Sequence, residues 1–270
     1  MIKFKYFFGS DSRSLPFLST LHDEISRLKV ITLPPKKKGR GRKNTTNPVE
    51  VFCIENNIDF DYFDDSKHYH DMEFGIVASF SKIFKNSFLN NNSELFNIHL
   101  SLLPKYRGPT PVETAILNNE IESGYTVFKI DKNIDTGKII FQNSLNIENK
   151  YASDIYSEIY NLFKSDFSSI DFHTTGLNQV GNTSSTVKFF KNDFNISGSS
   201  ISEAKNKIRA FDTLGPAFVV FNDKILKVHS YSDVENKSRI ELGDGYLFPV
   251  DVTPEGKRKM SFDDYLRGLK

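Results

Sequence analysis

Asn97 and His99 alternate with hydrophobic residues in the run 94–100, and Asp135 follows in a turn-forming Asp-Thr-Gly sequence. Alternation with a period of two sends both polar side chains to one face of a strand. An amide that donates hydrogen bonds, next to an imidazole that can be charged or neutral near neutral pH, can stabilise an oxyanion on a carbonyl carbon under attack. These residue types suit acyl transfer, although a lone histidine at a strand end is more often structural and Asp-x-Gly is a common turn.

The elements around these residues follow an alternating pattern. Strand-like runs occur at 2–8, 29–33, 74–79, 125–130 and 138–145, with helical patterns at 15–28 and 47–56. Such alternation predicts a doubly wound, mostly parallel α/β sheet. Binding and catalytic residues gather in loops at the carboxyl ends of such strands, which is where Asn97 and His99 are expected.

The chain leaves the sheet soon after His99. Residues 101–108 contain a proline and a glycine and predict a loop. A helix follows, for which Thr110 suits the N-cap, Pro111 the first position and Glu113 the third position of a capping box. Together these features predict a strand, a loop and a helix in immediate succession.

The last third of the chain has a different character. Residues 173–199 lose hydrophobic periodicity and are rich in Thr, Ser, Asn and Gly, which indicates a linker. After it, runs at 217–221 and 225–231 predict a hairpin. We therefore expect a catalytic α/β domain at 1–172, the linker, and a small, mostly β domain at 200–270.

Three motifs together resemble a known enzyme family. Asn97-x-His99 is followed by Ser-Leu-Leu-Pro-x-Tyr-Arg-Gly at 101–108 and, about one helix and one strand later, by Asp-Thr-Gly from Asp135. This order is similar to the signature of formyltransferases that use 10-formyltetrahydrofolate. The resemblance implies that Asn97, His99 and Asp135 are catalytic, that 10-formyltetrahydrofolate is the formyl donor, and that no metal takes part.

The resemblance also implies where the donor binds. Residues 78–84 align loosely with the loop whose backbone holds the pterin ring in this family. Residues 101–108 are expected mainly to position the site, with Arg107 contacting either a phosphate or a structural carboxylate. The residues expected to contact the donor are Ser79, Phe80, Ser81, Ser101, Leu102, Leu103, Pro104 and Gly137.

A basic segment points to the acceptor. Residues 36–43 hold six cations and two glycines, an electrostatic footprint for a polyanion if the segment lies beside an active site. Without hydrophobic periodicity it should be an exposed loop, and such clusters are often only solvated surface or a localisation tag. It resembles the Gly-Arg-Gly loop of methionyl-tRNA formyltransferases, which inserts beside the acceptor end of the tRNA. By this resemblance Lys38, Arg40, Arg42 and Lys43 contact tRNA.

The end of the chain carries a further resemblance. Residues 243–268 look like the last strand and closing helix of the second domain of methionyl-tRNA formyltransferases, an open β-barrel similar to an OB fold. Ser261 and Asp264 are spaced to cap that helix. Lys257 and Arg258 are expected to rest on tRNA phosphates.

Two features depart from the family pattern. The stretch 232–243 is short for this domain, so we expect the OB-like barrel to close differently and to hold tRNA less strongly. Ser12-Arg13-Ser14 stands where the tRNA enzymes usually have an aromatic residue near the methionyl side chain, and Phe17 is an alternative contact.

Composition limits the remaining possibilities. The chain has 270 residues, 38% of them hydrophobic, enough for one large and one small domain. A net charge of +1 means that affinity for nucleic acid must come from local patches. Cys53 is the single cysteine, so it cannot form an internal disulfide and is expected in the core. No run is hydrophobic enough to span a membrane and no leader peptide is recognisable, so we expect a cytoplasmic monomer.

The predicted function is formyl transfer from 10-formyltetrahydrofolate to the amino group of initiator methionyl-tRNA, in support of translation initiation. One alternative is a sugar N-formyltransferase acting on a nucleotide-linked amino sugar, which would keep Asn97, His99 and Asp135 but have no use for residues 36–43. Another is a folate- or RNA-binding homologue with weakened catalysis. The intact motifs argue against this last alternative, whereas the shortened C-terminal domain keeps it open.

Overall fold

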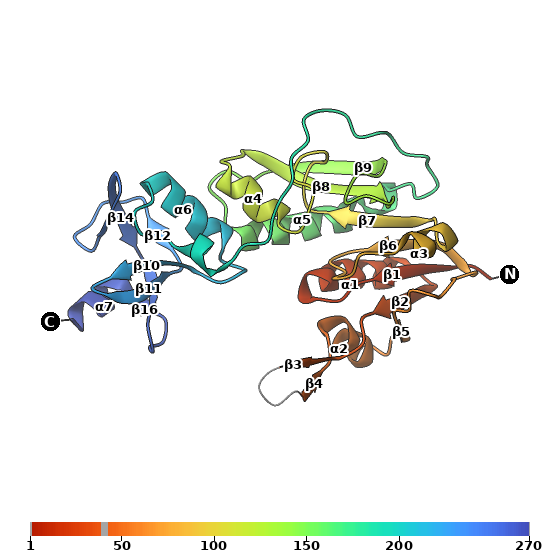
Figure 1. Ribbon diagram of the computed structural model, residues 1–270, viewed down its shortest axis with the longest axis horizontal. Coiled ribbons are helices and arrows are strands. Elements are labelled where there is room, and N and C mark those ends of the chain that lie inside the picture. Colours follow the sequence, from red (N-terminus) through yellow and green to blue (C-terminus); the bar gives the residue numbers. More distant parts are fainter. Residues whose placement is uncertain (1, 39–42, 270) are drawn as a thin grey trace. The chain divides into compact units, whose positions relative to one another are not determined.

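The computed structural model describes residues 2–38 and 43–269 (Figure 1). The chain divides into two compact units. Unit 1 comprises Met1–Arg107, Gly124–Ser144 and Ile159–Ser184, and unit 2 comprises Gly108–Ser123, Leu145–Glu158 and Ser185–Lys270. The domain boundaries expected at 172 and 199 stay predictions. The two units above are groups of residues that pack together, and each combines segments that are separate in the sequence.

A seven-stranded sheet in the order β5-β2-β1-β6-β7-β8-β9 forms the centre of unit 1. Its strands are β1 (Phe4–Phe8), β2 (Leu28–Thr32), β5 (Phe60–Tyr62), β6 (Met72–Val77), β7 (Leu95–His99), β8 (Glu122–Lys129) and β9 (Ile139–Asn146). From β5 to β7 all neighbours are parallel, whereas β8 is antiparallel to β7. The doubly wound, mostly parallel sheet predicted from the sequence is confirmed.

Helices lie between these strands and after the last of them (Figure 1). They are α1 (Leu15–Glu24), α2 (Pro48–Glu55), α3 (Asn86–Asn91), α4 (Pro111–Leu117) and α5 (Ala152–Asp166), with the 3-10 turns η1 (Ser12–Ser14) and η2 (Phe167–Ser169). Asn47 caps α2, because its side chain accepts a hydrogen bond from the backbone N–H of Glu50 at 3.0 Å. In the described ranges no helix combines the length and hydropathy needed to cross a membrane.

The ends of the basic segment are more ordered than the sequence predicts. Two short strands, β3 (Lys36–Lys38) and β4 (Lys43–Thr45), pair antiparallel, with Lys38 opposite Lys43. The expectation of an unpaired loop throughout 36–43 is therefore wrong at its two ends. Backbone pairing in a hairpin needs no hydrophobic alternation, so composition alone does not reveal it.

Aromatic side chains form one part of the unit 1 core. Phe8 of β1 is fully buried, and its ring lies 5.9 Å from Tyr69, 6.0 Å from Phe80 and 5.8 Å from Phe84, each edge to face. Rings in this arrangement attract each other beyond their buried area. The cluster holds the segment that follows β6 against β1.

Cys53 belongs to the core, as predicted. It lies in α2 and is fully buried, and burial raises the pKa of its thiol to about 11. A thiol that is protonated at neutral pH is a poor nucleophile. Cys53 therefore fills core space on the buried side of α2 and is a poor candidate for a nucleophile.

Unit 2 holds small antiparallel sheets. Their strands are β10 (Ala217–Phe221), β11 (Lys224–Val228), β12 (Tyr231–Ser232), β13 (Ile240–Leu242), β14 (Gly245–Pro249), β15 (Asp251–Pro254) and β16 (Met260–Ser261), accompanied by η3 (Lys191–Phe194), α6 (Ile201–Ala210) and α7 (Phe262–Arg267). One sheet has the order β10-β11-β15-β16 and the other β12-β14-β13. The predicted hairpin is β10 and β11, and its turn residues Asn222 and Asp223 have φ values of 49° and 59°, as a tight hairpin requires.

Two helix caps were predicted from the sequence, with different outcomes. At α7 the side chain of Ser261 accepts a hydrogen bond from the backbone N–H of Asp264 at 3.1 Å, which confirms the cap. At α4 Thr110 is the N-cap residue, but its hydroxyl donates to the carbonyl of Val187 at 2.8 Å and forms no cap bond. The capping box with Glu113 is therefore wrong: its carboxylate is fully buried and accepts a hydrogen bond from Tyr156.

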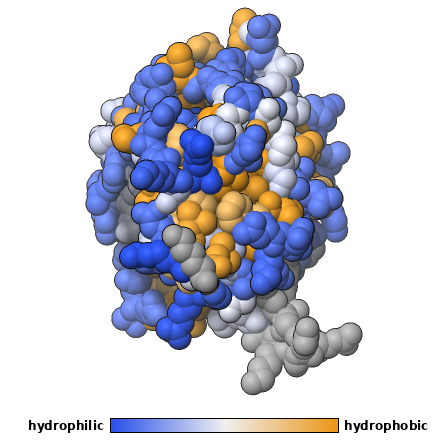
Figure 2. Space-filling view, turned by 90° about the vertical axis from the view of Figure 1, so that its left-hand side faces the viewer, coloured by the Kyte–Doolittle hydropathy of each residue, from blue (hydrophilic) through white to orange (hydrophobic). Residues whose placement is uncertain are grey.

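The surface of unit 2 is not uniformly polar. On the side where α7 lies, Figure 2 shows hydrophobic side chains gathered together and surrounded by hydrophilic ones. Exposed hydrophobic residues of this unit include Val220, Tyr246 and Val250. Beneath them a core of buried residues joins Val219, Leu226 and others to α6 and α7, so this unit has a hydrophobic core of its own.

Candidate active site

β7 carries two of the predicted catalytic residues. Asn97 and His99 occupy alternate positions, so their side chains leave the same face of the strand. His99 is 5% exposed and Asn97 is half-buried. Asp135 approaches from the turn between β8 and β9, and its Oδ2 lies 3.6 Å from Nδ1 of His99. Residues far apart in the sequence thus meet at the imidazole.

The hydrogen bonding of His99 defines its chemistry. Its Nε2 lies 2.7 Å from the carbonyl oxygen of Tyr106. Because a carbonyl can only accept, Nε2 must carry the proton of this hydrogen bond. Nδ1 is then the nitrogen that can gain or lose a proton, and it faces the carboxylate of Asp135.

The Asn97 side chain is available to a ligand. No hydrogen bond joins its amide to another residue within 2–38 or 43–269. Buried and half-buried polar groups normally have partners. An amide that leaves the same strand face as His99 can supply donors to an oxygen atom beside the imidazole.

The Asp-Thr-Gly turn has a tightly defined backbone. Asp135 has a φ of 54°, in the left-handed region, and the hydroxyl of Thr136 donates to the carboxylate of Asp131 at 2.7 Å. A Cβ on Gly137 would lie 1.7 Å from the carbonyl oxygen of Lys129, so only glycine fits there. The motif holds Asp135 in place through its neighbours.

The loop at 101–108 is tied to β8. The hydroxyl of Thr126, fully buried on β8, donates to the carbonyl of Ser101 at 2.6 Å and accepts from the backbone N–H of Leu103 at 3.1 Å. Ser101 itself donates to the carbonyl of Lys105 at 2.7 Å. Ser101, Leu103 and Pro104 are buried, whereas Leu102 is half-buried. Their contact with a donor stays a prediction, while their hydrogen bonds give the loop its shape.

A second pair of loops meets where the strand order reverses. The order runs outward from β1 through β2 on one side and from β6 on the other, and ligands bind at such switch points. The hydroxyl of Ser10, after β1, donates to the carbonyl of Ser79 at 3.2 Å and accepts from the backbone N–H of Ser81 at 2.9 Å. These hydrogen bonds fix the backbone of the loop that is predicted to bind the donor.

Phe80 and Ser79 occupy this loop in different ways. The Phe80 ring packs into the aromatic cluster around Phe8, so its side chain is turned toward the core. Ser79 has a φ of 44°, which turns the backbone sharply. If this loop binds a ligand, its polar contacts come from its backbone or its serine hydroxyls.

The predicted acceptor-binding residues lie in three settings. Arg40 and Arg42 fall outside the described residues. Lys38 is the last residue of β3 and Lys43 is the first residue of β4, its paired strand. In unit 2, Arg258 is exposed. The tRNA contacts of these residues stay predictions.

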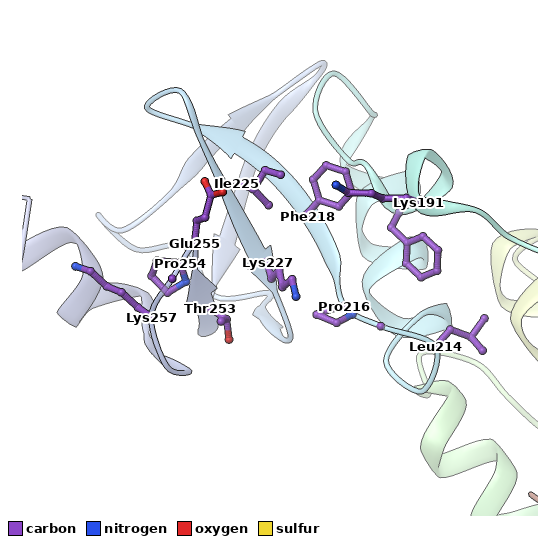
Figure 3. A pocket seen from close by; sticks show the side chains of 13 residues that line it. Lys191, Leu214, Pro216, Phe218, Ile225, Lys227, Thr253, Pro254, Glu255 and Lys257 are labelled. Carbon is purple, nitrogen blue, oxygen red and sulfur yellow. The ribbon is translucent and has the colours of Figure 1, made fainter. Parts of the chain in front are cut away.

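Lys257 lines a cavity of about 530 Å3 in unit 2 (Figure 3). Two further cations, Lys191 and Lys227, line the same cavity, together with the hydrophobic side chains of Phe218 and Ile225. A cavity of this size and mixed lining is typical of ligand sites.

Arg107 contacts a residue that the sequence did not indicate. Its Nε and Nη2 donate to Oε1 of Gln179 at 3.2 Å and 2.6 Å, so its partner in the chain is an amide rather than the carboxylate that was considered. Gln179 was missed because it lies in a segment without periodicity or a recognisable motif. The carbonyl of Tyr106 was missed because a backbone group leaves no trace in residue type.

Comparison with known proteins agrees with the motifs. A family model described as formyl transferase matches residues 14–164, more than half of the chain. A methionyl-tRNA formyltransferase from Thermosipho melanesiensis is 31% identical, covering 88% of this chain and 87% of its own length. One from Borrelia hermsii is 29% identical and covers 97% and 96%.

Solved structures share the architecture. The sugar 3N-formyl transferase WlaRD has a TM-score of 0.67 and 25% identity, with coverage of 96% of this chain and 100% of that one. The methionyl-tRNA formyltransferase from Clostridium thermocellum has a TM-score of 0.61 over 97% and 100%; its 14% identity makes this a likeness of fold alone.

The fold and the residues around His99 define an α/β transferase with its polar site at the carboxyl edge of a doubly wound sheet. The family match and the relatives then identify the lineage: this chain belongs to the formyl transferase family of enzymes.

The glycine of the Asp-Thr-Gly turn provides a test of the site's backbone. Gly137→Ala should lower the free energy of unfolding by about 1–3 kcal/mol, because the added Cβ forces the turn away from Lys129. Chemical denaturation measures this loss. Gly268→Ala is the control, since the atoms nearest its Cβ lie 3.6 Å away. Equal effects of both variants would contradict the close approach described for Gly137.

Proposed function

We propose that this enzyme transfers a formyl group from 10-formyltetrahydrofolate to the amino group of initiator methionyl-tRNA, as a cytoplasmic step in translation initiation. The observation that carries the formyl-transfer part is the His99 arrangement, in which Nε2 donates to Tyr106 and Nδ1 faces Asp135. The acceptor is inferred from the relatives and from the basic segment at 36–43.

In the proposed reaction the amine nitrogen of the acceptor attacks the formyl carbon. A C–N bond to the amine forms, the C–N bond to N10 of the folate breaks, the amine loses a proton and N10 gains one. The Asn97 amide holds the oxyanion of the tetrahedral intermediate by a hydrogen bond that strengthens as charge develops. His99 contributes a second donor when Nδ1 carries a proton, because its Nε2 proton is bonded to the carbonyl of Tyr106. Asp135 orients the imidazole or a water molecule and helps to accept the amine proton.

We place the donor ring at the loop near the strand-order reversal, because the backbone of this loop is braced. Ser10 braces the backbone of Ser79 and Ser81 from one side, and the aromatic cluster holds Phe80. A braced backbone can present hydrogen-bonding groups to a ligand without reorganising.

Charge supports a polyanionic acceptor. The segment at 36–43 carries six cations, and the cavity in unit 2 is lined by Lys191, Lys227 and Lys257 against one carboxylate, Glu255. Cations at two places can neutralise phosphates along an extended ligand, and such binding is salt-dependent. A small acceptor would need at most one of these sites.

A sugar N-formyltransferase is the second candidate. It is favoured by solved structures: besides WlaRD, the N-formyltransferase from Helicobacter canadensis, determined with folinic acid and dTDP-3-aminofucose, has a TM-score of 0.66 and 25% identity. That likeness covers 96% of this chain and all of the other. The basic segment has no evident use for such an acceptor, which ranks this candidate second.

The acceptor is tested by supplying 10-formyltetrahydrofolate with charged initiator methionyl-tRNA and, in parallel, with a nucleotide-linked amino sugar. We expect formyl transfer to the tRNA and none to the sugar. Transfer to the sugar alone would replace the first candidate by the second. Transfer to neither would leave donor binding as the activity to pursue.

The catalytic roles predict a specific kinetic pattern. Asn97→Ala should lower kcat roughly a hundred- to a thousand-fold, as loss of an oxyanion donor does, and His99→Ala should lower it at least as much. The donor dissociation constant should change much less. Asn90→Ala and His22→Ala, at exposed positions, serve as controls. Parallel losses of kcat and donor affinity would contradict a role in the transition state.

The basic segment predicts an effect that depends on salt. Arg42→Ala should raise KM for the tRNA and reduce the slope of log affinity against log salt by about one, since one phosphate contact is lost. Donor affinity should not change. Lys237→Ala removes an exposed cation of unit 2 as a control. An equal loss for donor and tRNA would argue against this assignment.

A further inference from the structure

We propose that Gln179 is a positioning residue for formyl transfer, because its side-chain amide ties together the two loops that supply the partners of the His99 imidazole. The inference rests on the proposed transfer chemistry at Asn97, His99 and Asp135. It gives a function to the segment 177–184, which the sequence indicated only as part of a linker. Figure 1 draws this segment next to β9.

The amide nitrogen of Gln179 holds the turn of Asp135. Nε2 donates at 2.9 Å to the carbonyl of Asp135 and at 2.9 Å to the carbonyl of Gly137. A primary amide has two N–H donors, and both are used on this one turn. The backbone that carries the Asp135 carboxylate is therefore bonded directly to Gln179.

The amide oxygen of Gln179 holds the other loop. Oε1 accepts from Nε and Nη2 of Arg107, and Arg107 directly follows Tyr106, whose carbonyl accepts from His99. Both sides of the imidazole are thus linked through one side chain. Only an amide can accept from the guanidinium and donate to two carbonyls at once.

The segment that carries Gln179 is itself anchored on each side. Leu177 exchanges two backbone hydrogen bonds of 2.8 Å with Ile139 of β9. Ser184 accepts from the backbone N–H of Tyr106 at its hydroxyl, at 2.8 Å, and from that of Arg107 at its carbonyl, at 2.9 Å. Gln179 is held between these anchors, so its four hydrogen bonds constrain the loops.

This arrangement makes Gln179→Glu an informative substitution. The carboxylate keeps the size of the side chain and can still accept from Arg107, but it loses both donors and sets negative charge against the carbonyls of Asp135 and Gly137. Displacement of a reacting group by about 1 Å can cost roughly a hundred-fold in rate. We expect kcat to fall about ten- to a hundred-fold, with KM for both substrates nearly unchanged.

The experiment measures kcat, KM and donor affinity for the wild type, Gln179→Glu and Gln179→Met, with formyl transfer by the wild type established first. Asn178→Ala is the control, because this neighbour is exposed on the same segment, and its kcat should stay within about two-fold. Thermal unfolding of each variant identifies any that fails to fold. If Gln179→Glu fails to fold, Gln179→Met replaces it as the test, because it also removes the donors but adds no charge.

A double-mutant cycle separates positioning from general stability. If Gln179 acts through Asp135, Gln179→Glu should cost almost nothing further in the residual kcat of Asp135→Ala. Additive losses, or an unchanged kcat in Gln179→Glu while the wild type transfers formyl groups, would overturn the inference. Absence of transfer by the wild type would instead count against the proposed function, so the two failures are distinguishable.

Discussion

The hydrogen bond from Nε2 of His99 to the carbonyl oxygen of Tyr106 is the constraint on which the site depends. It fixes the tautomer and orientation of a nearly buried imidazole and leaves one nitrogen free for proton exchange. The carboxylate of Asp135 faces that nitrogen because the hydrogen bond to Tyr106 holds the imidazole in this orientation. Strand β7 carries the donor of this hydrogen bond and the loop at 101–108 carries its acceptor. The segment 177–184 ties that loop to the turn of Asp135 through Gln179.

A strand alone cannot build such a site. β7 presents Asn97 and His99 side by side, but every partner of the imidazole comes from a loop, and loops need bonds of their own to keep a shape. Thr126 supplies them to one loop. At the other, the close approach of Lys129 to Gly137 allows only a glycine, so part of the familiar Asp-Thr-Gly motif reflects packing rather than chemistry.

The sequence predicts what depends on side-chain pattern. Alternating strands and helices indicated the sheet, and spacing indicated the cap of α7 by Ser261. The same spacing argument failed at Glu113. Its carboxylate is buried and accepts a hydrogen bond from Tyr156, so it does not cap the start of α4. Backbone acceptors such as Tyr106, and a partner such as Gln179 in a segment without periodicity, become visible only when tertiary contacts are known.

The choice of acceptor follows from a different set of residues than the choice of reaction. Groups that stabilise an oxyanion act on the formyl carbon and do not distinguish one amine from another. Relatives that act on tRNA and on sugars therefore both match this chain over nearly its full length. Discrimination must arise where the remainder of the acceptor lies, and a polyanion extends much further than a sugar. A tRNA acceptor therefore requires positive charge beyond the catalytic residues, such as that of residues 36–43, and a sugar acceptor does not.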